Sequence, residues 1–168
     1  MNTQRNIREQ RGTPAGPGFS QANPFFGLLP KEYKLRRKDF FTYNIRFNTL
    51  AASGTATLTA NVQNDSDFVW CIGVMAVTDN IFSTFTAATS VPILAELTDS
   101  SSGVQLQDSA THISNLFGTS QLPFTLPFPK IFKAGGQISV RLQNQIATAM
   151  VVNLSFHGFK TFFIPADA

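Results

Sequence analysis

The sequence predicts an all-β protein, an antiparallel sandwich or barrel of about eight strands that follows an extended N-terminal arm. Apolar and polar residues alternate with a period of two in several segments after residue 33. Turn-forming Gly, Pro, Asn, Asp and Ser separate these segments, and no convincing 3.6-residue period lasts beyond two turns. Phe accounts for 17 of the 168 residues, which favours pleated, half-buried strands. We therefore divide the chain into an arm, residues 1–32, and a β-sandwich domain, residues 33–168.

The arm combines turn-forming residues with large apolar ones. Four Pro and four Gly lie within residues 1–30, and their spacing predicts neither helix nor strand. Burying a large apolar side chain contributes about 1.5–3 kcal/mol, whereas ordering each backbone residue costs about 1–2 kcal/mol. We therefore expect the arm to be mobile in the free protein and ordered in a complex. Its apolar residues are Phe19, Phe25, Phe26, Leu28 and Leu29.

The first half of the β domain contains three predicted strands. Residues 39–48 place Phe41, Tyr43, Ile45 and Phe47 on one face, so that face is expected to be buried. Residues 54–64 alternate Thr with Ala, Leu and Val, as in a half-buried strand. Residues 68–77 are apolar on both faces, as in a central strand, and a polar turn at 64–67 precedes them.

The second half contains two hairpins and a long final strand. Residues 93–97 and 104–106 flank a Thr-Asp-Ser-Ser-Ser-Gly turn. The strand ending at 131–132 is followed by a Gly-containing turn and by an alternating strand over 138–142. A turn at 144–148 leads into the last strand, which runs from residue 150 to 162. Residues 112–117 fit a single helical turn.

Positive charge is concentrated before residue 41. Residues 1–40 hold eight basic and three acidic groups, whereas residues 41–168 hold five basic and seven acidic groups. This asymmetry indicates that the arm meets an acidic partner. Three interpretations of the basic cluster remain open: contact with nucleic-acid phosphates, a charged strand edge that resists aggregation, and a docking stripe for acidic subunits. The cluster comprises Lys34, Arg36, Arg37 and Lys38, with Tyr33 beside it.

Patterns that carry catalytic, metal or cofactor chemistry are missing from the sequence. The two histidines fit no metal motif, and no nucleophile elbow or phosphate-binding loop occurs. Cys71 is the single cysteine, so it forms no intramolecular disulfide, and we expect a buried, inert thiol. Asp65 and Asp67 suit a turn that they stabilise through backbone hydrogen bonds, with a calcium-binding turn as the alternative. We expect no enzyme, no catalytic residue, no bound metal and no cofactor.

The last third of the chain resembles small β-sandwich structural proteins of tailed bacteriophages. The resemblance lies in residues 124–144, with a Pro-flanked strand, a Gly-Gly turn and an alternating strand ending in Asn. Residues 153–162 add a closing strand with an aromatic-Gly-aromatic-Lys ending. The resemblance implies a jelly-roll-like sandwich built into a virion. Such a subunit would be a minor capsid, capsid cement or decoration protein, or a head-vertex or collar subunit. The resemblance implies no particular site residue.

These observations predict a structural virion protein that binds neighbouring subunits through its arm. The expected partners are major capsid or portal and neck proteins, together with copies of the chain itself, for which a trimer is plausible. Nucleic acid is a less favoured partner. No membrane is expected, because no apolar run reaches the length of a span and the N-terminus lacks a secretory signal. The expected location is the virion, after synthesis in the host cytoplasm. The alternative is a receptor- or carbohydrate-binding module of a phage fibre or tail.

The predicted partner-binding residues all belong to the basic, aromatic N-terminal region. They are Arg5, Arg8, Arg11, Phe19, Phe25, Phe26, Leu28, Leu29, Tyr33, Lys34, Arg36, Arg37 and Lys38.

Overall fold

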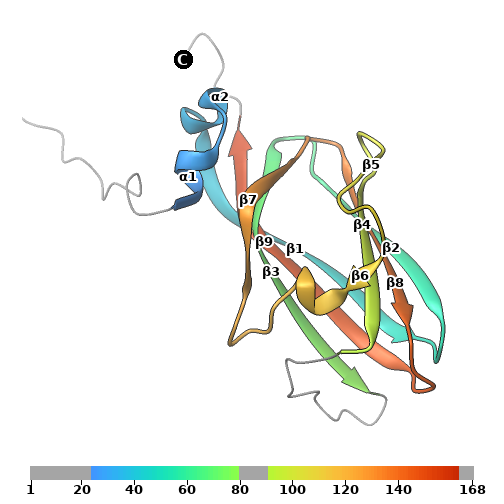
Figure 1. Cartoon of the computed structure of the whole chain (residues 1–168). Coiled ribbons are helices and arrows are strands. Elements are labelled where there is room, and N and C mark those ends of the chain that lie inside the picture. Colours follow the sequence, from blue (N-terminus) through green and yellow to red (C-terminus); the bar gives the residue numbers. More distant parts are fainter. Residues whose placement is uncertain (1–23, 80–90, 163–168) are drawn as a thin grey trace, which may run out of the picture.

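A computed structural model describes residues 24–79 and 91–162 of the chain. Two short helices precede a β-sandwich in which the strands make up most of the structure (Figure 1). The helices are α1 (Pro24–Leu28) and α2 (Lys31–Lys34), and a 3₁₀ turn spans Ile113–Asn115. The strands are β1 (Arg37–Leu50), β2 (Thr55–Asn61), β3 (Asp67–Asp79), β4 (Ile93–Asp99), β5 (Val104–Gln105), β6 (Thr111–His112), β7 (Phe124–Phe132), β8 (Gln137–Asn144) and β9 (Met150–Phe162).

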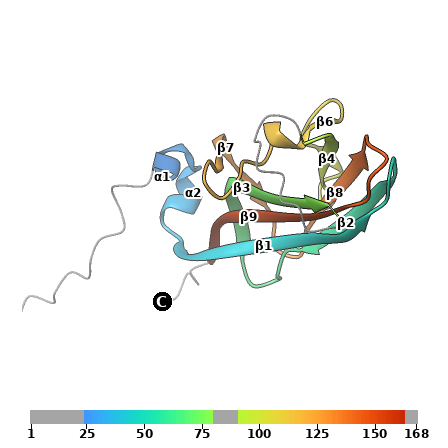
Figure 2. The same cartoon turned by 90° about the horizontal axis from the view of Figure 1, so that it is seen from below.

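The strands form two antiparallel sheets that pack face to face. One sheet has the order β1-β9-β3-β7, and the other has the order β2-β8-β4-β5 with β6 also paired to β4 (Figures 1 and 2). Strands from the first half of the chain pair with strands from the second half: β1 with β9, β2 with β8, and β3 with β7. The chain is thus one long antiparallel hairpin wound into two sheets, which is the jelly-roll arrangement.

The main core lies between the two sheets. Alternate residues of β1 point into it, so Tyr43, Ile45 and Phe47 are buried while the residues between them are exposed. Aromatic rings fill its centre: the ring centroids of Phe117 and Phe156 lie 5.1 Å apart in an edge-to-face arrangement. This packing makes the sandwich a scaffold on which surface segments are held in place.

The predicted fold class, an antiparallel jelly-roll-like sandwich, is confirmed. The strands expected at 39–48, 54–64, 68–77, 93–97, 138–142 and 150–162 are present, and the helical turn expected at 112–117 appears as the 3₁₀ turn. The described residues form nine strands rather than about eight. β5 lies within the strand predicted at 104–106, whereas the two-residue β6, which pairs with β4, was not predicted.

The two short helices were not predicted. Pro24 begins α1 and Pro30 immediately precedes α2, positions where a missing backbone N–H does not interrupt a helix. The predicted division of the chain after residue 32 falls within α2 and stays a prediction. Over the parts of the chain that the structure describes, no helix is both long enough and apolar enough to cross a membrane.

Candidate functional site

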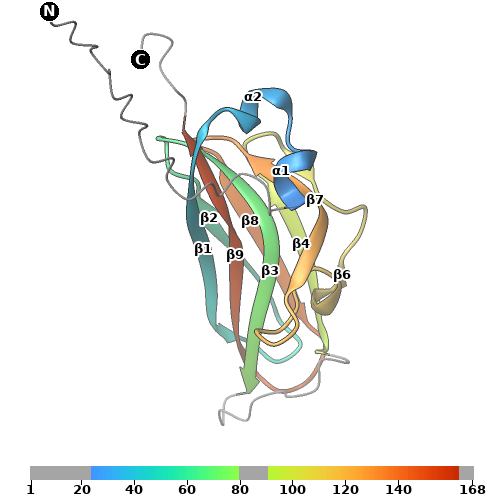
Figure 3. The ribbon, with the colours of Figure 1, turned by 90° about the vertical axis from the view of Figure 1, so that its left-hand side faces the viewer.

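The N-terminal segment, residues 24–38, packs its helices over one end of the outer face of the β1-β9-β3-β7 sheet (Figure 3). Phe25, Leu29 and Tyr33 follow one another at intervals of four and are 8%, 3% and 2% exposed. Successive residues of a strand point to opposite faces of the sheet. Phe68 and Trp70 of β3 point into the core between the sheets, so Val69 between them points to the outer face. The sheet residues beneath the segment are Val69, Cys71 and Phe159, with Ile72 and Ile131 at the margin.

The Phe26 ring adds an aromatic contact to this packing. It meets the Phe159 ring edge-to-face, with centroids 5.3 Å apart. The Lys38 ammonium lies 5.2 Å from the centroid of the Phe26 ring, within the range of a cation–π contact. The segment therefore has its own small apolar core, separate from the core between the sheets.

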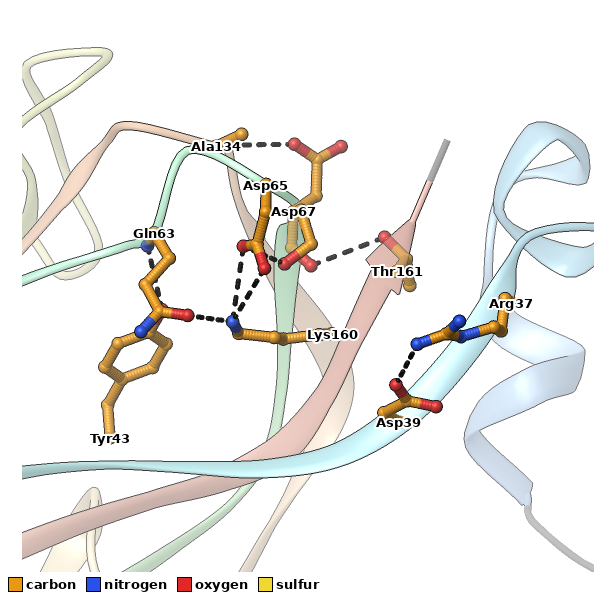
Figure 4. Close-up of polar contacts among 10 residues, drawn as sticks. Arg37, Asp39, Tyr43, Gln63, Asp65, Asp67, Ala134, Lys160 and Thr161 are labelled. Atoms are coloured by element: carbon orange, nitrogen blue, oxygen red, sulfur yellow. Dashed lines mark hydrogen bonds and ion pairs between the residues drawn. The ribbon is translucent and has the colours of Figure 1, made fainter. Parts of the chain in front are cut away.

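Asp67, the first residue of β3, fixes the segment to the sandwich. Its carboxylate accepts hydrogen bonds from the Tyr33 hydroxyl at 2.7 Å, from Arg36 Nη1 at 2.9 Å and from the Ala134 backbone N–H at 2.9 Å. Lys133 Nζ lies 3.5 Å from the same carboxylate and also donates to the Tyr33 hydroxyl. Figure 4 shows the bond from Ala134. We call this group of residues the Asp67 anchor.

The Asp67 anchor is electrostatically satisfied. Burial acts to raise the pKa of Asp67, but hydrogen bonds from Ala134, Tyr33 and Arg36 outweigh it, so the pKa lies below its usual value. Burial raises the pKa of Tyr33 above its ordinary value. Asp67 is therefore ionised at neutral pH, and Tyr33 remains a neutral hydrogen-bond donor. This arrangement is suited to holding a segment in place.

Most of the basic cluster is occupied by contacts within the chain. Arg36 bonds to Asp67 and its guanidinium carbon lies 4.2 Å from the centroid of the Tyr33 ring. Lys38 Nζ donates to the backbone oxygens of Lys34 and Arg36, both at 2.9 Å, and so caps the end of α2. Burial lowers the pKa of Lys38.

A second polar group lies beside the anchor, at the same end of the sandwich. Lys160 Nζ donates to Gln63 Oε1 and lies 3.2 Å from Asp65 Oδ1, while the Gln63 backbone N–H donates to the Tyr43 hydroxyl at 3.0 Å (Figure 4). Arg37 forms an exposed ion pair with Asp39 at 2.7 Å. The positive charge of this end is thus largely matched by carboxylates of the same chain.

Large apolar side chains remain exposed along and just after the segment. Leu28 is 48% exposed, and Leu35 and Phe40 are each 76% exposed. The Phe40 ring stacks on the imidazole of His157 at the sheet surface, with centroids 6.2 Å apart. Apolar groups that are presented by an otherwise anchored segment, between charged residues, are typical of a protein-binding surface.

The predicted partner-binding residues fall into three groups. Arg5, Arg8, Arg11 and Phe19 lie outside the described residues. Phe25, Leu29, Tyr33 and Arg36 are brought together against the chain's own sheet, an intramolecular role that was not predicted. Leu28, Lys34 and Arg37 are exposed, whereas Phe26 and Lys38 are partly exposed. Binding of a partner by any of these residues stays a prediction.

Two elements of the site were missed by sequence reasoning. Asp67 was assigned to a turn, although its position directly before a buried strand was the available signal for an anchoring carboxylate. Leu35 was not singled out, because nothing in the local pattern shows that it faces solvent. The alternation over 39–48 places Phe40 on the face opposite the buried one, but it was not counted among the partner-binding residues.

Cys71 and Trp70, two further residues that were considered for function, are both buried. Cys71 is 3% exposed, which confirms the expected burial of its thiol, and this burial raises its pKa to about 12. Trp70 is buried and donates its indole N–H to the Ile72 carbonyl at 2.8 Å, so its ring offers no surface for a sugar. Within residues 24–79 and 91–162, no three His, Cys, Asp or Glu residues gather in a way that could hold a metal.

Comparisons with known proteins give no family for the chain. No family model matches it, and no curated protein matches it. Among solved structures, the crystal structure of the infectious bursal disease virus VP2 subviral particle is similar, with 11% sequence identity and a TM-score of 0.28. The match covers 76% of this chain and 38% of the VP2 chain. A similarity of this size does not assign a function.

Proposed function

We propose that the protein is a non-catalytic structural subunit of a virion that binds neighbouring subunits through its N-terminal region. In the finer form of the proposal, it is a capsid cement or decoration protein, or a head-vertex or collar subunit of a tailed phage. Its partners are other virion proteins, major capsid or portal and neck subunits, and it acts in the assembled particle.

One observation carries this proposal: the anchored segment presents apolar side chains to solvent. The Asp67 anchor and the buried Phe25 hold the backbone in place, so Leu28, Leu35 and Phe40 are exposed on an ordered support. An ordered support lowers the entropy cost of binding, because fewer groups must be immobilised at the interface. The surface therefore fits a partner that offers apolar pockets, with an acidic group near the exposed Lys34.

The jelly-roll order of the strands and the phage-like pattern in residues 124–144 and 153–162 agree with this proposal. Both are weaker support, because one fold serves many functions. The low proportion of charged residues, 14% of the chain, also suits a subunit whose surface is covered by neighbours.

The test replaces Leu28, Leu35 and Phe40 by Ser in one variant and measures its incorporation into particles. The matched control replaces Leu122 and Phe128, which are 72% and 71% exposed and lie outside the N-terminal region, by Ser. We expect the first variant to fold but to be lost from particles at least tenfold, and the control to be incorporated normally. Equal incorporation of both variants would refute the role of this surface.

A further inference from the structure

The outer strands of the two sheets differ in how well they are protected against pairing with another chain. β7 has Pro127 and Pro129 in its interior, and β5 and β6 are two residues long each. β1 has three charged residues at its start and Arg46 farther along. β2 has neither device: Thr55–Asn61 is a regular strand without Pro and without charge. Natural proteins protect such edges unless they are covered in the assembled state.

The backbone groups of β2 alternate between its partner and its free edge. The Asn144 N–H donates to the Gly54 carbonyl at 2.9 Å, and the Val62 N–H donates to the Gly136 carbonyl at 2.8 Å. Pairing with β8 is regular between these points, so the even-numbered residues bond to β8. The N–H and C=O groups of Thr55, Thr57, Thr59 and Asn61 therefore point to the free edge. Among the described strands, β2 pairs with β8 alone, and Figure 1 shows it at the margin of the molecule.

The sequence of β2, Thr-Ala-Thr-Leu-Thr-Ala-Asn, is nearly symmetric about Leu58. If two copies are placed antiparallel with Leu58 opposite Leu58, then Ala56 lies opposite Ala60 and Thr57 lies opposite Thr59. Every residue except the terminal pair of Thr55 and Asn61 thus meets a residue of its own type. A strand that matches itself in this way suits an isologous twofold contact.

We propose that the β2 edge binds the β2 edge of a second copy of this chain, in antiparallel register centred on Leu58. In this register, Thr57 and Thr59 form hydrogen-bonded pairs, because their free backbone groups face the partner strand. Leu58 occupies the non-hydrogen-bonded position on the twofold axis, where opposite Cα atoms lie about 4.5 Å apart and side chains are closest. The β2-β8-β4-β5 sheets of the two copies then form one continuous sheet across the dimer.

The observations favour a second copy over another partner. β2 has no charge to select an acidic or basic ligand, and its Thr and Ala side chains are too small to fill a pocket. Leu58, 38% exposed, is covered by its own symmetry mate in the proposed register. Thr–Thr and apolar cross-strand pairs are favourable in antiparallel sheets. This inference is independent of the proposed virion role.

The first experiment measures the mass of the full-length protein by sedimentation at increasing concentration. We expect a dimer for the native chain and for Thr59→Val, which keeps the backbone N–H. Thr59→Pro removes an N–H that points away from β8, so the fold is retained, but each copy loses a bond to its partner. We expect it to raise the dimer Kd about a hundredfold. A monomeric native chain, or a dimer that Thr59→Pro leaves unchanged, overturns the proposal.

The second experiment tests the register. Leu58→Cys places two thiols at a Cα separation that a disulfide can span, whereas Thr57→Cys leaves its two copies about 8–9 Å apart. We expect Leu58→Cys to form a covalent dimer under mild oxidation and Thr57→Cys to remain uncrosslinked, while the buried Cys71 does not react. Equal crosslinking of both variants overturns the proposed register. If the dimer is lost when Leu28, Leu35 and Phe40 are replaced by Ser, but is retained in Thr59→Pro, this inference is overturned and the N-terminal binding surface is supported.

Discussion

Replacement of Asp67 by Asn tests the anchor that holds the N-terminal segment on the sheet. The substitution preserves the size of the side chain and an oxygen that can accept the Ala134 N–H, but it removes the negative charge. Arg36 and Lys133 then face a neutral group. Asp67 is almost fully buried, with 2% of its side chain exposed, and the side chain of Arg36 is 13% exposed.

The structure sets the expected size of this effect. Removing one partner of a fully buried ion pair costs about 3–5 kcal/mol. Lys133 is 65% exposed and recovers most of its hydration, so the cost falls at or just below the lower end of the range. We expect a loss of about 2–3 kcal/mol in the free energy of unfolding, which corresponds to a fall in Tm of about 4–12 °C for a chain of this length.

Two measurements check the expectation. Denaturant unfolding gives the free energy, and hydrogen exchange reports on the segment itself, since the Tyr33 N–H donates to the Pro30 carbonyl at 2.9 Å. We expect amides of residues 24–34 to exchange faster in Asp67→Asn. The control is Asp39→Asn, which breaks the exposed pair with Arg37 and is expected to cost less than about 1 kcal/mol. If Asp67→Asn matches this control in both measurements, the anchor does not hold the segment.

Three further predictions concern other parts of the structure. As the pH falls, the native chain should lose its stability advantage over Asp67→Asn. The reason is that the pKa of Asp67 in the folded state lies below its value in the unfolded state, about 3.9. The advantage is therefore complete above the unfolded-state pKa and disappears below the folded-state pKa. Unfolding of both proteins from pH 7 to pH 2 checks this, and a constant difference would contradict it. Gly158→Ala should lower the free energy of unfolding by about 3 kcal/mol, because an added Cβ would lie 1.9 Å from the Val69 carbonyl oxygen; a change under 1 kcal/mol in denaturant unfolding would show that the strands adjust. Cys71, with its pKa raised to about 12, should react with a thiol reagent at pH 8 only after denaturation, and rapid labelling of the folded protein would disprove its burial.

The sandwich could be predicted because its strands are long and regularly patterned. Tyr43, Ile45 and Phe47 lie on the buried face of β1, as the alternation predicted. In a strand whose apolar residues alternate with polar ones, only the apolar face can pack against the core. β6 could not be predicted in the same way, because a two-residue strand is defined by its pairing with β4 rather than by a pattern of its own.

The N-terminal segment could not be predicted from local pattern. Pro24, Gly27 and Pro30 leave too few residues for a helical period, and the helices form because Phe25, Leu29 and Tyr33 are buried on a distant part of the chain. The Asp67 anchor has the same origin: Tyr33, Asp67 and Ala134 come from three separate regions, and only the tertiary fold brings them together. The sequence pattern identifies the apolar residues of the segment, but it does not separate those that face the sheet from those that face solvent.

The number of copies of this chain in purified particles tests the proposed function most directly. Quantitative mass spectrometry of virions from an infected host that expresses the chain measures it against the major capsid protein. We predict a fixed copy number per particle, hundreds for a shell or cement subunit and about a dozen for a neck or collar subunit. Particles that lack the chain while the folded protein accumulates in the host would contradict a structural role in the virion.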